Sequence, residues 1–260
     1  MATFLFDSTV FGPVISRRLG VSLGVNLLPN DSKLCSFDCI YCECGWNPDS
    51  KYVKAKLPTR DEVKLALENK LADMKSRNQM PDVITFAGNG EPTMHPHFEA
   101  IIDDTLALRQ VYAPQSRVAV LSNSTMLFKP KVVEALKKVD DNILKLDSAR
   151  IDTIKKMNKP VGKFDLNRVL EQLKQFEGEL IIQTMFLKGE FNNEIIDNTT
   201  DEELSAWMKL IKEIAPQKVL IYTIARDTPV NSLEKVSIEK LNSIASALNE
   251  ATGIKVEVSA

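Results

Sequence analysis

Val83-Ile-Thr-Phe-Ala87 is a short apolar run, rich in β-branched and aromatic residues, that is typical of a buried β-strand. Residues 118–121 and 143–146 have the same character, and segments of helical period at 98–110 and 131–139 lie between the three runs. Strands that alternate with helices are joined by right-handed crossovers and form a parallel sheet. This stretch therefore predicts an α/β fold.

The alternation extends in both directions from this stretch. The sequence predicts further strands at residues 21–27, 180–185, 219–222 and 254–258. It predicts further helices at residues 60–76, 166–176, 201–214 and 238–251. Thr59 and Thr200 are expected N-caps, because acidic residues follow them and place Glu62 and Glu203 at capping-box distance.

The whole chain of 260 residues is expected to form a single domain, since no repeat or Ser/Gly linker interrupts the alternation. Its expected parts are an N-terminal segment with the first strand (1–30), a cysteine-containing loop (31–58) and the remaining βα units (59–260). Hydrophobic residues make up 44% and charged residues 26%, the balance of a chain that builds a packed core.

Charge and hydropathy exclude some classes of function. The formal net charge of −2 gives no general attraction to nucleic acid or anionic membranes. The first residues lack the basic and apolar regions of a secretory signal, and no stretch is long and apolar enough to span a bilayer. We therefore expect a cytoplasmic protein without a membrane partner.

All the cysteines, Cys35, Cys39, Cys42 and Cys44, lie within ten residues of one another. In a reducing compartment such a group is typical of a metal site rather than of a disulfide framework. Thiolates are soft ligands that suit zinc and iron-sulfur clusters. Because each all-cysteine cluster takes about four thiolates, the sequence has no room for a second cluster.

The spacing Cys35-Ser-Phe-Asp-Cys39-Ile-Tyr-Cys42 allows three thiolates to hold three corners of a four-iron cube and to leave one iron open. Two alternatives remain. A zinc ribbon is one, although zinc sites usually pair their ligands as two separated hooks. In the other, Cys44 supplies a fourth ligand and closes the cluster; otherwise it is a thiol beside the site.

These residues resemble the signature of the radical S-adenosylmethionine (radical SAM) superfamily, in which Tyr41 occupies the aromatic place before the last cysteine. The resemblance implies a partial (βα)6 barrel with a mostly parallel sheet. It also implies that Cys35, Cys39 and Cys42 hold a 4Fe-4S cluster whose open iron binds S-adenosyl-L-methionine. Reductive cleavage would then give methionine and a 5′-deoxyadenosyl radical that abstracts hydrogen from a substrate.

The glycine turn after the strand at 83–87 resembles the turn that binds the methionine amino group in the superfamily. Gly88 and Gly90 permit backbone to approach a ligand closely, and Glu91 supplies a carboxylate for an ammonium group. A plain turn is the alternative for such a short motif.

Other candidate contacts to the cosubstrate follow the next strands, because parallel sheets bind ligands at the carboxyl ends of their strands. We expect Ser122 and Asn123 to contact ribose hydroxyls or the methionine carboxylate, while Ser124 or Thr125 has the alternative role of capping the next helix. Asp147 resembles the position in the superfamily where a polar residue meets the ribose.

Several further residues have two possible roles. Gln183 and Met185 either face the substrate or adenine, or pack in the core. Arg226 and Asp227 either contact substrate or form a surface ion pair. His95 and His97 edge the site or form a helix entry. Basic residues near the cysteines either steer an anionic partner or form a solvated rim; they are Arg17, Arg18, Lys51, Lys54, Lys56 and Arg60.

The stretch from Phe11 to Gly24, together with Cys42-Glu-Cys-Gly45, loosely resembles the branch that builds the wyosine base of transfer RNA. That branch carries a second cluster, for which this chain has no cysteines. The resemblance leaves the substrate open among a nucleoside or RNA base, a peptide and a glycyl-radical enzyme, and implies a flavodoxin- or ferredoxin-like electron donor. The alternatives are an electron-transfer protein with a closed cluster and a zinc-stabilised nucleic-acid-binding module.

Overall fold

The main sheet has eight strands in the computed structural model, which describes residues 4–16, 19–49 and 56–259. Its order is β1-β2-β3-β4-β5-β6-β9-β11, and every neighbouring pair is parallel except β1 and β2. The strands are β1 (Val10–Ser16), β2 (Gly20–Val25), β3 (Val83–Phe86), β4 (Arg117–Ser122), β5 (Asp141–Lys145), β6 (Ile181–Met185), β9 (Lys218–Tyr222) and β11 (Lys255–Ser259).

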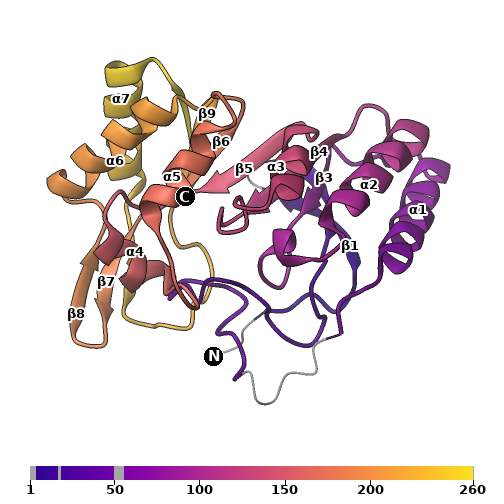
Figure 1. Cartoon of the computed structure of the whole chain (residues 1–260), viewed down its shortest axis with the longest axis horizontal. Helices are drawn as coiled ribbons and strands as arrows, with labels where there is room; N and C mark the ends of the chain where they lie inside the picture. Colours follow the sequence, from indigo (N-terminus) through magenta and orange to yellow (C-terminus); the bar gives the residue numbers. More distant parts are fainter. Residues whose placement is uncertain (1–3, 17–18, 50–55, 260) are drawn as a thin grey trace.

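Helices cover the outer face of this sheet, which curls into a half-barrel (Figure 1). The helices are α1 (Arg60–Ser76), α2 (Phe98–Tyr112), α3 (Pro130–Lys137), α4 (Ile151–Asn158), α5 (Leu166–Lys174), α6 (Asp201–Ile214) and α7 (Ile238–Thr252), with a short 3₁₀ helix, η2 (Pro92–Met94); α4 lies beside β8 rather than on the main sheet (Figure 1). The α/β fold and the partial barrel predicted from the sequence are confirmed. No helix in the described residues is both long and apolar enough to cross a membrane.

Strand residues alternate between two apolar clusters. Ile84 and Phe86 of β3 belong to the large cluster under the helices, whereas Val83 belongs to a smaller cluster inside the half-barrel. The inner cluster also holds Ala119, Ile143, Ile181 and Leu220 from the neighbouring strands. Side chains two residues further along each of these strands therefore also face the inside of the half-barrel, near the carboxyl ends of the strands.

The two predicted helix caps differ. Thr59 and Glu62 form a complete capping box, in which the Thr59 N–H donates to the Glu62 carboxylate over 2.7 Å. Thr200 accepts from the Glu203 N–H, but the Glu203 carboxylate instead accepts from Ser148 and Thr153. The predicted N-cap at Thr200 is therefore confirmed, whereas the capping box that the spacing indicated there does not form.

Some elements were not predicted. The edge strand β1 and helix α4 are two of them, and a separate antiparallel sheet, in the order β10-β7-β8, is the third. Its strands are β7 (Leu187–Phe191), β8 (Glu194–Asp197) and β10 (Leu233–Lys235). Asn192 and Asn193 form the turn between β7 and β8, both with positive φ, and an Asn pair of this kind suits a tight hairpin.

Candidate functional site

The cysteine loop is held between two parts of the barrel. Leu34 pairs with Gly90 after β3, and Phe37 pairs with Pro160 after α4. The Ile40 N–H also donates to the last turn of α4, at the Met157 carbonyl, over 3.0 Å. Helix α4, which was not predicted, is therefore a support of this loop.

Both glycines of the turn after β3 are required by close contacts. Gly90 has φ +141°, and a Cβ there would lie 1.9 Å from the Leu34 carbonyl oxygen. Gly88 has φ +157°, and a Cβ there would lie 2.4 Å from the Asn26 side-chain oxygen. A side chain at either place would push the cysteine loop or the end of β2 out of position.

The cysteine loop, the glycine turn and the ends of four strands surround one cavity of about 280 Å³. Nine of the ten residues singled out for the cluster and cosubstrate line it: Cys35, Cys39, Tyr41, Cys42, Gly88, Gly90, Glu91, Ser122 and Asn123. Gln183 and Met185 line it as well, as do Cys44, Lys145 and Tyr222. The carboxyl ends of the strands thus bring together segments more than a hundred residues apart in the sequence.

The thiols have surroundings that fit an iron-sulfur cluster. The Cys35 sulfur accepts from the Phe37 N–H at 3.4 Å and from the Asn123 amide at 3.5 Å, and the Cys39 sulfur accepts from the Asn158 amide at 3.5 Å. Hydrogen bonds of this kind stabilise thiolates and tune bound clusters. Within residues 4–16, 19–49 and 56–259, no three Cys, His, Asp or Glu side chains converge on the position of a single ion; the thiols line the cavity wall.

The pKa values of the thiols differ because their surroundings differ. Burial raises the pKa of Cys39 to about 11. A hydrogen bond with Cys44 lowers the pKa of Cys42 to about 6, against the opposing effect of burial. The Cys44 thiol also donates to the Gly88 carbonyl at 3.4 Å, and Cys44 lines the same cavity as Cys42.

Lys33 is a buried cation near the cysteines that the sequence analysis missed. Its ammonium group donates to the Gly45 carbonyl at 2.8 Å and to Asp38 at 3.2 Å. Burial acts to lower the pKa of Lys33, but the nearby Cys42 and the other thiols outweigh it and raise the pKa. The ammonium group therefore stays charged beside the cysteines.

Glu91 is buried and held by several donors. Its carboxylate accepts from the Ser122 hydroxyl at 2.9 Å, from the Asn123 N–H at 2.6 Å and from the Thr93 N–H at 3.1 Å. Burial raises the pKa of Glu91, and these hydrogen bonds oppose the rise. Ser122 and the backbone N–H of Asn123 thus orient Glu91, while the side-chain amide of Asn123 donates to the Cys35 sulfur.

Asp147 lies behind the cavity rather than on its wall. Its side chain is fully buried and accepts from the Tyr41 hydroxyl, from the Asn158 amide at 2.7 Å and from the Lys145 ammonium at 3.2 Å. The Met185 N–H donates to its other oxygen at 2.9 Å. Its contact with ribose stays a prediction, while the observed contacts show that Asp147 holds Tyr41 and Lys145.

Lys145 and Asn158 are site residues that the sequence analysis did not single out. Lys145 donates to the Tyr41 hydroxyl at 2.7 Å, and nearby Asp147 raises its pKa despite burial. A lysine inside the apolar run at 143–146 was the available signal, because a charge in a buried strand needs a partner. Asn158 lacked such a signal, since an Asn at a helix end is common.

Several alternatives are now decided. Ser124 and Thr125 do not cap the next helix, because α3 begins at Pro130 after Lys129. Arg226 pairs with Glu43 at 2.7 Å rather than with Asp227. His97 occupies the N-cap position of α2, as a helix entry.

The basic residues near the cysteines are only partly described. Lys56 lies 3.8 Å from Glu62, and Arg60 donates to Asp104 at 2.6 Å, as expected for a solvated rim. Four others lie outside the described residues: Arg17, Arg18, Lys51 and Lys54.

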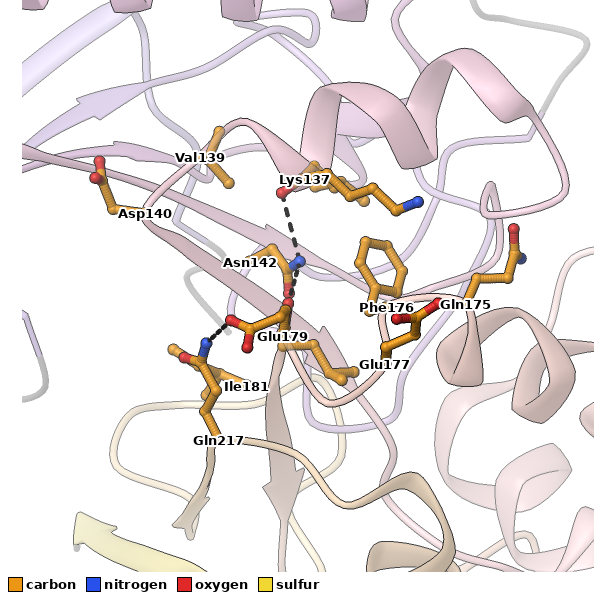
Figure 2. A pocket seen from close by; sticks show the side chains of 12 residues that line it. Lys137, Val139, Asp140, Asn142, Gln175, Phe176, Glu177, Glu179, Ile181 and Gln217 are labelled. Atoms are coloured by element: carbon orange, nitrogen blue, oxygen red, sulfur yellow. Dashed lines mark hydrogen bonds between the residues drawn. The ribbon is translucent and has the colours of Figure 1, made fainter.

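A second hollow lies at the opposite edge of the sheet, at the amino ends of β5, β6 and β9, with a volume of about 410 Å³ (Figure 2). The Asn142 amide donates to backbone carbonyls of Leu136 and Glu179, and the Gln217 amide donates to the Glu179 carboxylate. None of the predicted site residues lines it.

Comparisons with known proteins agree with this geometry. The family model of the Radical SAM superfamily matches residues 30–201. The chain is 29% identical to a protein of Brachyspira hyodysenteriae named GTPase Obg, over 96% of this chain and 35% of that protein. It is 33% identical to a UPF0026 protein of Helicobacter pylori, over 84% of this chain and 66% of that protein. The chain thus spans about a third of the first relative and just under two thirds of the second.

Two solved structures show the fold. One is a radical SAM methyltransferase from Sphaerobacter thermophilus, with a TM-score of 0.66 and 13% identity, over 92% of this chain and 65% of that one. The other is TYW1 with a lysine-pyruvate adduct bound, with a TM-score of 0.60 and 13% identity, over 90% of this chain and 74% of that one.

Proposed function

The chain belongs to the radical SAM superfamily and is an enzyme of that superfamily, and we propose that Cys35, Cys39 and Cys42 hold a 4Fe-4S cluster that cleaves S-adenosyl-L-methionine. The observation that carries the proposal is the single cavity lined by these thiols and by the glycine turn. When bound, the cluster supplies the electron that splits the cosubstrate into methionine and a 5′-deoxyadenosyl radical able to abstract hydrogen.

The chain's own residues would bind and orient the cosubstrate. The Glu91 carboxylate is placed to accept from the methionine ammonium, because it lines the cavity and is already oriented by Ser122 and Asn123. Gly88 and Gly90 line the same cavity beside Glu91. Apolar side chains of Leu121 and Met185 on the wall exclude water from the radical.

The Lys145 ammonium is a fixed positive charge on the cavity wall. It is held by Tyr41 and Asp147, so its position does not depend on the ligand. A cation fixed in this way favours an anionic group of the cosubstrate, such as the methionine carboxylate, without reorganising when the ligand binds.

An external one-electron donor of the flavodoxin or ferredoxin type would reduce the cluster. The substrate classes that we retain are a nucleoside or RNA base, a peptide and a glycyl-radical enzyme. The TYW1 structure contains a lysine-pyruvate adduct, but a second cluster of the wyosine branch has no cysteines available here.

One observation favours a second candidate. Cys44 lines the same cavity and hydrogen-bonds with Cys42, so it is close enough to the cluster site to act as a fourth ligand. A cluster closed by Cys44 would carry electrons and would not bind the cosubstrate. A zinc-stabilised nucleic-acid-binding module has no such observation in its favour.

The test is anaerobic reconstitution with iron and sulfide, reduction, addition of S-adenosyl-L-methionine and quantification of 5′-deoxyadenosine by mass spectrometry. We expect product from the wild type and from Cys44→Ser, and none from Cys39→Ala. A fully loaded wild type that forms no product, together with loss of cluster iron in Cys44→Ser, would instead support the closed cluster. A colourless protein that binds only zinc would contradict the proposal.

A further inference from the structure

A larger cavity of about 690 Å³ lies directly beside the cosubstrate cavity. Glu43, Ala87 and Leu121 line both cavities, so the two share a wall. Its volume is within the range of small-molecule sites. Any group bound there faces the place where we propose that the radical forms.

Aromatic side chains of the N-terminal segment form one wall of this larger cavity. The rings of Phe6 and Phe11 stack with centroids 3.5 Å apart and planes at 19°, and the Phe4 ring meets Phe6 edge-on at 4.9 Å. Gly24 of β2 makes room for this stack, because a Cβ there would lie 2.1 Å from the Phe11 ring. The aromatic wall therefore packs directly against strand β2 of the barrel.

The same wall is tied to the cosubstrate site by hydrogen bonds. Asn89, between the two glycines of the turn, donates to the Phe6 carbonyl at 2.8 Å and accepts from the Phe6 N–H at 2.9 Å. The Phe4 N–H donates to the carbonyl of Glu43, which lies between Cys42 and Cys44, at 3.0 Å. Movement of the aromatic wall is therefore coupled to the glycine turn and to the cysteine loop.

Several of the polar groups that the structure describes in this cavity pair with one another. Among the described lining residues, the charged ones are Glu43, Arg226 and Asp227, and Arg226 already pairs with Glu43. The hydroxyls of Ser22 and Thr85 hydrogen-bond with each other at 2.8 Å. The charged residues that the structure describes here therefore include no unpaired cation for a phosphate or carboxylate.

We propose that this cavity is the substrate site and that it takes an uncharged, mostly apolar ring. The proposal rests on the proposed function, because it is the shared wall with the cosubstrate that makes the cavity a substrate site. Offset stacking on the Phe6–Phe11 pair and apolar contact with Val14 and Leu121 would bind such a ring. The same ring chemistry comes either from a free small molecule or from a side chain of a peptide.

The first test is binding of the uncharged fluorophore prodan to the cluster-loaded protein. We expect one saturable site, and Val14→Trp should weaken binding by about tenfold or more, because the indole fills the cavity. Ile195→Trp is the matched control: Ile195 is 82% exposed on β8 and does not line this cavity, whereas Val14, 43% exposed, does. Equal binding by both variants would overturn the proposal.

Two further measurements sharpen the result. If Val14→Trp does not fold, Phe4→Ser removes part of the aromatic wall and should weaken prodan binding by about fivefold. Indole should displace prodan at about a tenth of the concentration that indole carboxylate needs, and the reverse order would contradict an uncharged ligand. A blocked tripeptide with a central tryptophan that outcompetes indole would identify a peptide substrate, and the opposite order would identify a small molecule.

Failure of this inference is distinguishable from failure of the proposed function. Cys39→Ala should lose 5′-deoxyadenosine formation and still bind prodan. Wild-type protein that forms 5′-deoxyadenosine but has no saturable prodan site would overturn the substrate site alone. Prodan binding that is sensitive to Val14→Trp, without any cosubstrate cleavage, would overturn the proposed function and leave a ligand cavity.

Discussion

The two edges of the main sheet both carry a hollow, yet their chemistry differs. At the carboxyl edge, thiols, Glu91 and Lys145 line the cavity, and each is positioned by contacts from other strands or loops. At the amino edge, Asn142 and Gln217 both donate to Glu179, which lies in the connection between α5 and β6. The amino-edge hollow is the larger of these two, so volume does not identify the site.

The difference follows from how parallel strands are connected. Each strand of the parallel sheet ends at the carboxyl edge and continues into a loop. Residues that bind ligands lie in these loops, so glycines, cysteines and carboxylates gather at that edge. The chain returns to the amino edge at helix ends, where turns such as those at Glu177 and Ala215, both with positive φ, reverse its direction. Substitutions at the two edges should therefore differ in their effects.

The largest effect is expected from Gly90→Ala at the carboxyl edge. The added Cβ would lie 1.9 Å from the Leu34 carbonyl oxygen, in a backbone conformation that disfavours side chains. The free energy of unfolding, measured by urea titration, should fall by about 3 kcal/mol, with loss of cluster incorporation.

Gly162→Ala is the control for this prediction. Gly162 also has positive φ, +89°, but no atom lies within 4 Å of an added Cβ. Its cost should be about 1 kcal/mol, from the backbone conformation alone. Equal costs for the two variants would show that the contact with Leu34 is unimportant.

The next effect is expected from Lys145→Met, which removes the cation beside the fully buried Asp147. Loss of one partner of a buried pair is strongly destabilising, but Tyr41 and Asn158 still donate to Asp147, and Lys145 is 15% exposed. We expect a loss of about 2 kcal/mol in unfolding free energy.

A double-mutant cycle checks that this loss comes from the pair. Lys145→Met combined with Asp147→Asn should cost less than the sum of the two single variants by about 1 kcal/mol. Strict additivity, measured by the same urea titrations, would mean that the two residues stabilise the fold independently.

Glu91→Gln should lower the affinity for S-adenosyl-L-methionine about tenfold, because a neutral amide replaces the carboxylate that we propose for the methionine ammonium. Isothermal titration calorimetry on the cluster-loaded protein would measure this. An unchanged dissociation constant would remove Glu91 from the cosubstrate site.

The raised pKa of Glu91 gives this affinity a pH dependence. Burial raises its pKa, so on acidification the carboxyl takes up its proton at a higher pH than an ordinary glutamate, and cosubstrate affinity should fall in that range. Protonation of Glu91 stabilises the fold at low pH, and this contribution is lost as the pH rises through the raised pKa. Wild-type affinity should decline on acidification, whereas Glu91→Gln should show no such decline.

The smallest effect is expected from Gln217→Ala at the amino edge. Its amide donates to an exposed carboxylate, that of Glu179, so the unfolding free energy should change by no more than about 0.5 kcal/mol. The yield of 5′-deoxyadenosine should not change. A large loss of this product would show that the amino edge takes part in function.

Sequence patterns were sufficient for the elements that bury an apolar face. Strand β3 and helix α1 are examples, because a continuous apolar run predicts the buried strand and the helical period predicts the helix. The three-residue strand β10 is too short for a period to be recognised, and helix α4 was not predicted either. Their positions depend on contacts with the cysteine loop and with β7.

The sequence by itself determined the α/β alternation, the cysteine spacing and the glycine turn, because each is a local pattern of side-chain chemistry. Only the tertiary structure decided that Asp147 holds Tyr41 and Lys145 behind the cavity wall, and that Phe6 and Phe11 form a wall beside it. The physical reason is that burial and pairing of a charge depend on neighbours that are distant in sequence, which local patterns do not specify.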